Sequence, residues 1–465
     1  MVKSNTYHVE GKVDSGSHQT IKTVKKRLFQ NASWLFGGKT LAGGFSAIQT
    51  VILARLLGVD NYGLLVLIIA YVDILNNFFD FRVWETATKY IGTFWTNGER
   101  EKTLSMVKLS YIIDISSGIL AFIIAILTAK IASSHLIHSP NAYTLIWIYS
   151  LSLLIDTANS TSDAILRVFD RFKRIAFVSS FISLFRLILV VLFLYFGMGI
   201  NGVVLSFILA SFLGFSIRMW IVSKTLRENQ LNNWWRSDLS LVKDQWKGIA
   251  WFMGNTSFAG TLSMANDNFM GELFLGYFSG KEAVAYYKVA KSFVKLITRI
   301  MDPIYEAIYP ELVRISTLNA LKDFKRLVKY STKNLINFTI PAAIAVLIFA
   351  NPIMSLIFGK EYLPAANTLR VVTVAVLISQ LTFWVTPTLL AFGRPGLRTV
   401  MLIISNTSYI ALLFLLVPKY SYIGAAFAFL GYVVVRGFTS VICLNAYIKK
   451  ERDKISKTQV TLTNV

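Results

Sequence analysis

A stripe of basic side chains runs along one segment that is otherwise apolar. Lys288, Lys291, Lys295 and Arg299 follow one another at steps of three and four residues, and Asp302 lies about one helical turn further on. That spacing places all five on one face of a helix. Four like charges repel one another, so the stripe predicts a water-filled cavity that binds a strongly anionic group such as a pyrophosphate. The alternative, if this segment belongs to a membrane protein, is a helix that extends beyond the bilayer and exposes its basic face to water.

Other charged residues lie within apolar segments, where each is costly without water, an anion or a partner of opposite sign. Arg186 and Arg436 are weaker candidates for binding the same anion. Asp73, Asp80 and Asp267 are candidates for coupling to a proton or a cation. For these carboxylates, a salt bridge with a neighbouring Lys or Arg is the competing interpretation.

Cysteine and histidine chemistry is not expected from this sequence. It contains a single cysteine, Cys443, and four histidines, at positions 8, 18, 135 and 138. One cysteine excludes a disulfide framework and a metal site built from cysteines. The histidines lie in the N-terminal tail and in one loop, so they predict no catalytic centre. We therefore expect no resident metal, no other cofactor and no enzymatic activity.

The elements that position these residues must be membrane helices. Of 465 residues, 54% are hydrophobic and 15% are charged, and the mean hydropathy is +0.55. A water-soluble fold of this size would leave too much apolar surface exposed. Lysine and arginine number 47 against 25 acidic residues, for a net charge of +22. In a membrane protein this excess indicates cytoplasmic loops, so we expect no nucleic-acid partner.

Apolar segments separated by turn signals predict an all-α, polytopic membrane protein with about twelve transmembrane helices. We place the spans at residues 32–57, 62–92, 106–133, 141–166, 175–197, 201–223, 248–276, 281–307, 330–358, 364–392, 397–417 and 422–447. Lys and Arg gather at both termini and in the even-numbered connections. The opposite connections hold only Lys130, Lys281, Lys360 and Lys419. Both termini are therefore predicted to be cytoplasmic.

The second half of the chain resembles the first. Residues 34–58 are similar to residues 251–276, and residues 200–204 are similar to residues 422–426. Six predicted spans separate each pair, so the two six-helix halves have the same orientation and enclose a central cavity between them. Chance similarity between Gly-rich apolar segments is the alternative.

The predicted organisation has five parts. They are a disordered cytoplasmic tail, a first six-helix bundle, a cytoplasmic linker, a second six-helix bundle and a basic cytoplasmic tail, at residues 1–27, 28–223, 224–247, 248–448 and 449–465. In the linker, the spacing of Leu239, Val242 and Trp246 favours an amphipathic helix at the membrane surface.

Several short motifs carry a family resemblance. They lie at residues 53–58, 62–63, 88–91, 267, 275–276, 283–284, 286–287 and 290. With the span pattern and the repeat, the similarity extends from about residue 28 to residue 447. On these features the chain resembles the polysaccharide flippases of the multidrug/oligosaccharidyl-lipid/polysaccharide exporter superfamily. Arg82 and Glu85 depart from this family, whose members often have small or apolar residues there.

The resemblance implies a function that agrees with the basic stripe. Such flippases move undecaprenyl-pyrophosphate-linked oligosaccharide repeat units across the bacterial inner membrane by alternating access, for O-antigen or other surface polysaccharides. Membrane lipid surrounds the polyprenyl tail. The resemblance also implies possible coupling to H⁺ or Na⁺ and polysaccharide polymerase or ligase partners.

Three other functions compete with this interpretation. A multidrug exporter of the same superfamily shares the twelve-span plan, but its substrates are usually cationic and the basic stripe would repel them. A membrane glycan polymerase or ligase is disfavoured by the short external connections and by the lack of a recognisable catalytic set. A non-transporting structural protein would leave the membrane cations without a ligand.

Overall fold

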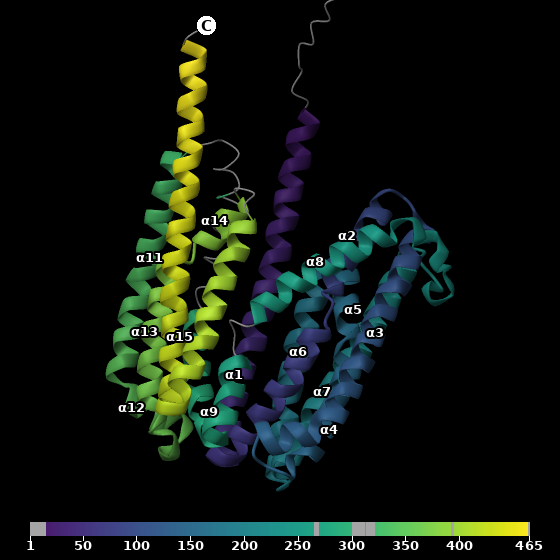
Figure 1. Cartoon of the computed structure of the whole chain (residues 1–465). Helices are drawn as coiled ribbons and strands as arrows, with labels where there is room; N and C mark the ends of the chain where they lie inside the picture. Colours follow the sequence, from purple (N-terminus) through teal and green to yellow (C-terminus); the bar gives the residue numbers. More distant parts are fainter. Residues whose placement is uncertain (1–14, 265–268, 300–311, 313–320, 392–394, 464–465) are drawn as a thin grey trace, which may run out of the picture.

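The computed structural model describes residues 15–264, 269–299, 312, 321–391 and 395–463. Within these ranges the chain is helical apart from short connections and contains no strand. The helices form two groups that diverge toward one end of the molecule, and α1 (Ser15–Phe79) packs against α9 (Phe269–Arg299) between them (Figure 1). This arrangement confirms the predicted all-α, two-half architecture.

Helices occupy the described part of every predicted span, with short interruptions. After α1, the first half continues with α2 (Val83–Thr96), α3 (Arg100–Ile131), α4 (Ala142–Asp156), α5 (Ala158–Val168), α6 (Phe172–Tyr195) and α7 (Gly199–Glu228). Besides α9, the described helices of the second half are α8 (Trp246–Met264), α11 (Leu321–Ile348), α12 (Ala350–Ile353), α13 (Ala365–Leu381), α14 (Val385–Ala391) and α15 (Pro395–Thr463).

Three long helices bend sharply. The bend in α1 is at Gly58 (φ 71°, ψ 174°), and the bend in α9 is at Gly280 (φ 79°, ψ 178°). This backbone conformation is essentially restricted to glycine, because a Cβ atom would clash with the backbone. α15 bends at Ser421, where φ is 50°. Each bend lies between two predicted spans, so one continuous run of residues crosses the membrane and turns back.

The bends recur at a constant separation along the chain. The residue numbers of Gly58 and Gly280 differ by 222, and so do those of Gly199 and Ser421, which both have positive φ. The two π-helical turns, Ala132–Leu136 and Met354–Phe358, are separated by the same 222 residues. Three independent features at one spacing confirm the predicted repeat of two similarly oriented halves.

The structure corrects the register of the repeat at one point. Sequence similarity paired Gly58 with Gly276, whereas the equivalent bend lies at Gly280. Gly276 remains inside α9, and its Cα faces the Leu67 side chain of α1 so closely that a Cβ would not fit. The glycine therefore permits close packing of Leu67 between the halves, although in the sequence it resembles a turn residue.

The terminal segments are helical where we predicted tails. α1 already begins at Ser15, inside the predicted disordered tail of residues 1–27, and α15 continues through most of the predicted tail of residues 449–465. Once a helix is nucleated in the membrane, each added residue costs little, so the helix propagates into polar sequence. The two terminal helices project from the same end of the molecule (Figure 1).

The linker between the halves forms two 3-10 turns, Trp234–Arg236 and Leu239–Gln245, and not the predicted amphipathic helix. The Trp234 ring stacks on Tyr111 of α3 with 4.8 Å between ring centres, and Val242 is buried. Packing of these apolar side chains on α3 replaces the membrane contacts that an amphipathic helix would have made.

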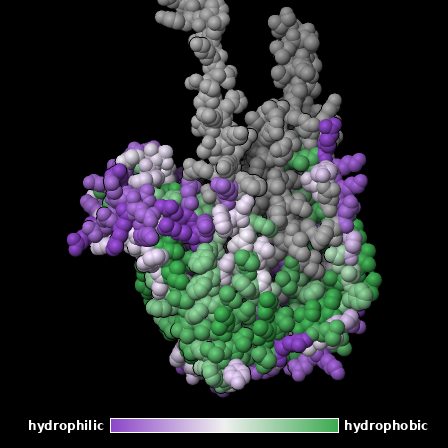
Figure 2. Space-filling model, turned by 180° about the vertical axis from the view of Figure 1, so that it is seen from behind, coloured by the Kyte–Doolittle hydropathy of each residue, from purple (hydrophilic) through white to green (hydrophobic). Residues whose placement is uncertain are grey.

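A belt of apolar side chains surrounds the helices. Figure 2 shows this belt as a broad zone with hydrophilic surface at both ends of the molecule. By length and composition, seven stretches of described helix could cross a membrane, and Ser33–Thr96 and Gly396–Cys443 each contain two predicted spans. The chain is a multi-pass membrane protein.

Candidate functional site

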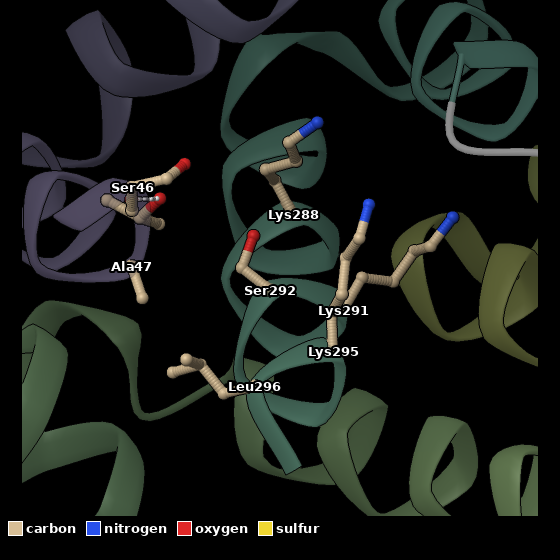
Figure 3. Close-up of a pocket in the computed structure, with 8 residues that line it drawn as sticks. Ser46, Ala47, Lys288, Lys291, Ser292, Lys295 and Leu296 are labelled. Atoms are coloured by element: carbon tan, nitrogen blue, oxygen red, sulfur yellow. Dashed lines mark hydrogen bonds between the residues drawn. The ribbon is translucent and has the colours of Figure 1, made fainter. Parts of the chain in front are cut away.

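The basic stripe lines a cavity at the seam between the two halves. α9 contributes Lys288, Lys291, Ser292, Lys295 and Leu296 to this cavity of about 210 Å³, and α1 contributes Ser46, Ala47 and Thr50. The ammonium groups of Lys291 and Lys295 point to the same side of α9, whereas Ser292 lies toward α1 (Figure 3). This lysine cavity therefore has one wall from each half.

Lys288 has a carboxylate partner. Its Nζ lies 2.7 Å from Oε1 of Glu272, whose side chain is only 1% exposed. The second carboxylate oxygen of Glu272, Oε2, has no hydrogen-bond partner in the described part of the chain. The stripe is therefore less positive at the end nearer to Gly280 than the spacing alone predicts, because Glu272 compensates the first lysine.

Lys291 and Lys295 are held differently. The Nζ of Lys291 lies 5.2 Å from the ring centre of Tyr287 and 5.3 Å from that of Phe429. Aromatic faces position an ammonium group without cancelling its charge. Lys295 is exposed, and among the described residues it forms no ion pair. Lys295 therefore carries an exposed positive charge into the cavity, and Lys291 lies beside it between two aromatic rings.

Three predicted positions are not covered in full. The backbone of α9 reaches Arg299, but its side chain lies outside the described residues, as does all of Asp302. Asp267 also lies outside the described residues. A role for these residues remains a prediction from the sequence.

Arg186 lies within the first half and does not line the lysine cavity. Its Nε donates a hydrogen bond to Oε1 of Gln49 at 3.2 Å, and its guanidinium lies 5.2 Å from the Phe207 ring centre. Asp156 and Asp73 also interact with it electrostatically. Arg186 is therefore held by residues of its own half, and Asp73 is the acid that it shares with Lys288 of the lysine cavity.

Arg436 lines a second cavity, inside the second half. This cavity of about 220 Å³ is lined by Ser379, Thr382, Phe383, Thr386, Val433 and Arg436. The Nη1 of Arg436 donates a hydrogen bond to the Tyr432 hydroxyl at 3.3 Å. The Arg436 cavity and the lysine cavity share no lining residue, so Arg436 and the lysines belong to separate sites.

The candidate coupling acids have different surroundings. The charges that act on Asp73 come from Lys288, Asp156, Glu272 and Arg186. Asp80 lies where the second span is interrupted before α2, and its Oδ1 accepts a hydrogen bond from the Arg82 backbone N–H at 3.0 Å. Asp80 therefore stabilises the interruption, whereas Asp73 shares an electrostatic environment with Lys288 of the lysine cavity.

Sequence reasoning missed the α1 wall of the lysine cavity. It predicted that Glu272 could form a salt bridge with a Lys or Arg of the cavity, but it did not identify Lys288 as the partner. Ser46 and Thr50 lie four residues apart on one helical face, but small hydroxyl residues are common in membrane helices, so this signal is weak. Glu272 belongs to the same helix as Lys288, yet the bend at Gly280 separates them. Helical periodicity therefore could not have paired these two residues.

The two halves are in contact beside the bends of α1 and α9. The Nζ of Lys281 lies 2.7 Å from Oδ2 of Asp60. The Tyr362 hydroxyl donates a hydrogen bond to the carbonyl oxygen of Ala54 at 3.1 Å. These contacts close the seam near the turns, at the end of the molecule opposite to the projecting terminal helices (Figure 1).

Known proteins that resemble this chain are membrane proteins. Residues 52–367 match the model of a family described as polysaccharide biosynthesis protein. The inner membrane protein YghQ of Escherichia coli (strain K12) is 25% identical over 340 residues, which cover 73% of this chain and 95% of that protein.

Two solved structures have the same fold at low sequence identity. The lipid II flippase MurJ, in an inward closed conformation, has a TM-score of 0.71 and 17% identity, covering 88% of this chain and 86% of that chain. An inward-facing multidrug resistance MATE family transporter has a TM-score of 0.71 and 14% identity, covering 90% of this chain and 96% of that chain. The family model covers more than half of the chain, so the chain belongs to the family described as polysaccharide biosynthesis protein.

Proposed function

We propose that this protein is a flippase that moves undecaprenyl-pyrophosphate-linked oligosaccharide repeat units across the bacterial inner membrane. The observation that carries the proposal is the lysine cavity, which places Lys291 and Lys295 where the two halves meet. The family description and the flippase among the similar structures support it. The translocated repeat units are then used to build O-antigen or another surface polysaccharide.

In this proposal the pyrophosphate is the group that the lysine cavity recognises. Lys291 and Lys295 donate charge-assisted hydrogen bonds to its oxygens. The hydroxyls of Ser46 and Ser292 line the same cavity and reach oxygens that the ammonium groups leave free. The polyprenyl tail remains in the surrounding membrane lipid, because burying it within the polar cavity would gain nothing over the bilayer.

Lys288 links substrate binding to the acidic residues. It is shared between Glu272, at 2.7 Å, and the incoming anion. Asp73 lies within the electrostatic range of both Lys288 and Glu272. A proton or sodium ion bound at these carboxylates releases Lys288 to the pyrophosphate, and loss of that ion restores the original pair. Asp267 is a further candidate for this coupling.

Transport follows from movement of one half against the other. With both termini cytoplasmic, as the loop charges predict, the closed seam faces outward. Rocking of the halves breaks the contacts of Lys281 with Asp60 and of Tyr362 with Ala54, and it opens the lysine cavity to the outer face. Polymerase or ligase partners there then use the glycan.

Deletion of the gene tests the function as a whole. We expect a complete undecaprenyl-pyrophosphate repeat unit to accumulate on the cytoplasmic side and the surface polysaccharide to be lost. Extraction and mass spectrometry of lipid-linked intermediates measure this directly. Normal intermediates and polymer combined with heightened drug sensitivity would instead indicate a multidrug exporter.

Variants of the lysine cavity test the site. Lys291→Ala combined with Lys295→Ala removes two charged ligands, and we expect transport to fall by about 100-fold or more. Lys243→Ala, at an exposed position of the linker, is the matched control that removes a charge elsewhere. Normal surface polymer from a stably expressed double variant would contradict the assignment of the site.

A further inference from the structure

The Arg436 cavity, defined above by its six lining residues, differs in chemistry from the lysine cavity. It contains one cation, three hydroxyl side chains and one aromatic ring. Within the described part of the chain, Arg436 forms no ion pair, and its guanidinium donates a hydrogen bond to the Tyr432 hydroxyl. A guanidinium carries five N–H groups in a planar fork, so most of them remain to bind a ligand.

The cavity exists because the tenth span is interrupted. α13 ends at Leu381 and α14 begins at Val385, which leaves Thr382 and Phe383 in a short turn beside α15. Thr382 adopts a non-helical conformation (φ −117°, ψ 11°). This turn presents Thr382 and Phe383 to the same space as Arg436.

The hydroxyls of the Arg436 cavity are positioned to accept hydrogen bonds. Ser379 Oγ already donates to the Val376 carbonyl at 2.7 Å, and Thr382 Oγ1 donates to the Ser379 carbonyl at 3.4 Å. A hydroxyl that donates its only proton can still accept through its lone pairs. The cavity thus suits a ligand that combines several O–H donors with one anionic group.

The Arg436 cavity and the lysine cavity both border one face of α15, where a row of side-chain contacts lies between them. Lys291 contacts the Phe429 ring, Phe429 stacks on Tyr432 with 6.2 Å between ring centres, and Tyr432 accepts the hydrogen bond from Arg436. These three α15 residues lie at steps of three and four, and Arg436 is about 10 Å along the helix from Phe429. One extended ligand can therefore reach both cavities.

We propose that the Arg436 cavity binds the carboxylate of an acidic sugar, so that the transported repeat unit contains a uronic acid or a similar sugar acid. A single planar carboxylate matches the fork of one guanidinium, whereas the multiply charged pyrophosphate matches the lysines. The sugar hydroxyls donate to Ser379 and Thr382, and the C–H face of the pyranose ring packs on Phe383. This inference rests on the proposed function.

Binding of D-glucuronate to the full-length protein in nanodiscs of neutral lipid tests the proposal. Saturation-transfer NMR detects such weak binding, with glucuronate methyl ester and D-glucose as neutral probes. We expect glucuronate to bind better than either, and Arg436→Gln to reduce its binding by roughly tenfold. Arg436→Lys keeps the charge but loses the planar fork, and we expect it to recover only part of the binding.

Two variants and one competitor locate the binding site. Lys243→Gln in the exposed linker should leave glucuronate binding at the wild-type level, and Lys295→Gln shows whether the acid binds in the lysine cavity instead. Loss of binding in Lys295→Gln but not in Arg436→Gln would place the acid in the lysine cavity and overturn the proposal. Equal binding of glucuronate and its methyl ester, or full displacement by inorganic phosphate, would also overturn it. If Arg436→Gln does not fold, Thr382→Val replaces it and should weaken binding as well.

Export in cells separates this inference from the proposed function. In a deletion strain complemented with Arg436→Gln, we expect lipid-linked repeat units to accumulate. Normal export by Arg436→Gln alongside blocked export by the lysine double variant would contradict the sugar-acid site but leave the flippase function intact. No effect of deletion on any lipid-linked intermediate would remove the flippase function itself.

Discussion

The two halves of this membrane protein share one backbone frame but differ in how their membrane charges are paired. In both halves a glycine bend and a π-helical turn recur 222 residues apart. In the first half, Arg186 lies among Asp73, Asp156 and Gln49. In the second half, Lys291 and Lys295 face a cavity at the seam. A duplicated frame therefore permits one half to compensate its charges internally while the other presents them to a ligand.

Further contacts in the first half follow the same pattern. Oδ2 of Asp114 accepts hydrogen bonds from both the backbone N–H and the hydroxyl of Thr161, at 2.9 and 2.6 Å. Arg218 Nε lies 3.3 Å from Oδ1 of Asp163. A charged residue in a membrane span is therefore not by itself an indication of a ligand. What distinguishes the lysine cavity is that three lysines of one helix line the same space where the two halves meet.

The shared frame can be broken at its two glycines. We expect Gly58→Ala and Gly280→Ala each to lower the free energy of unfolding by about 3 kcal/mol, because both residues have a conformation that a Cβ makes strained. Space is not the cause: Gly280 has no atom near its added Cβ, and Gly58 has only Glu361 Oε2 at 3.7 Å. Unfolding of the purified protein in mixed micelles measures both changes.

Gly37→Ala is the matched control for these substitutions. Gly37 lies inside α1 with open space around its added Cβ, so alanine should stabilise the protein by about 0.5–1 kcal/mol. If Gly58→Ala lowers the free energy of unfolding but Gly280→Ala does not, the two bends are not equivalent in energy. The repeat would then extend to backbone geometry but not to stability.

The sequence was sufficient to predict the frame and the charge of the site, but not the contacts. Apolar segments predicted the spans, because membrane burial acts on each span locally, and the internal repeat predicted the two halves. The stripe of Lys288, Lys291 and Lys295 predicted a basic cavity because like charges on one membrane helix face need water or an anion. The positions of Arg186 and Arg436 outside the lysine cavity depend on which helix faces point inward. Packing between distant segments decides those orientations, and the sequence does not reveal it.

Arg186 tests whether the first half really compensates its own charges. Arg186→Gln removes the cation but keeps an amide near Gln49, so Asp73 and Asp156 lose a compensating charge. We expect the free energy of unfolding to fall by about 2 kcal/mol, less than for a fully buried pair because the side chain is half-buried. Thermal unfolding in detergent measures this change.

The control for Arg186 keeps the charge. Arg186→Lys should recover most of the lost stability, although it loses the planar geometry of the guanidinium. Asp156→Asn in the Arg186→Gln background should also recover stability, because it removes one of the uncompensated acids. If Arg186→Gln is as stable as the wild type but cannot transport, Arg186 acts as a ligand after all, and the contrast between the halves fails.

The smallest expected effect concerns the seam where the two halves meet. Asp60→Asn removes the ion pair with Lys281, whose Nζ and the Asp60 Oδ2 are 2.7 Å apart. Both side chains are substantially exposed, at 53% and 32%, so solvent screens the pair and its loss should favour separation of the halves by about 0.5 kcal/mol, or roughly twofold. Distances between spin labels placed on either side of the seam report this shift.

The charge exchange Asp60→Lys with Lys281→Asp is the control. It should restore the wild-type distribution of these distances, because it rebuilds the ion pair in reverse. An unrestored distribution would mean that packing of the bends, which also includes the Tyr362 bond to Ala54, holds the seam without help from the charges.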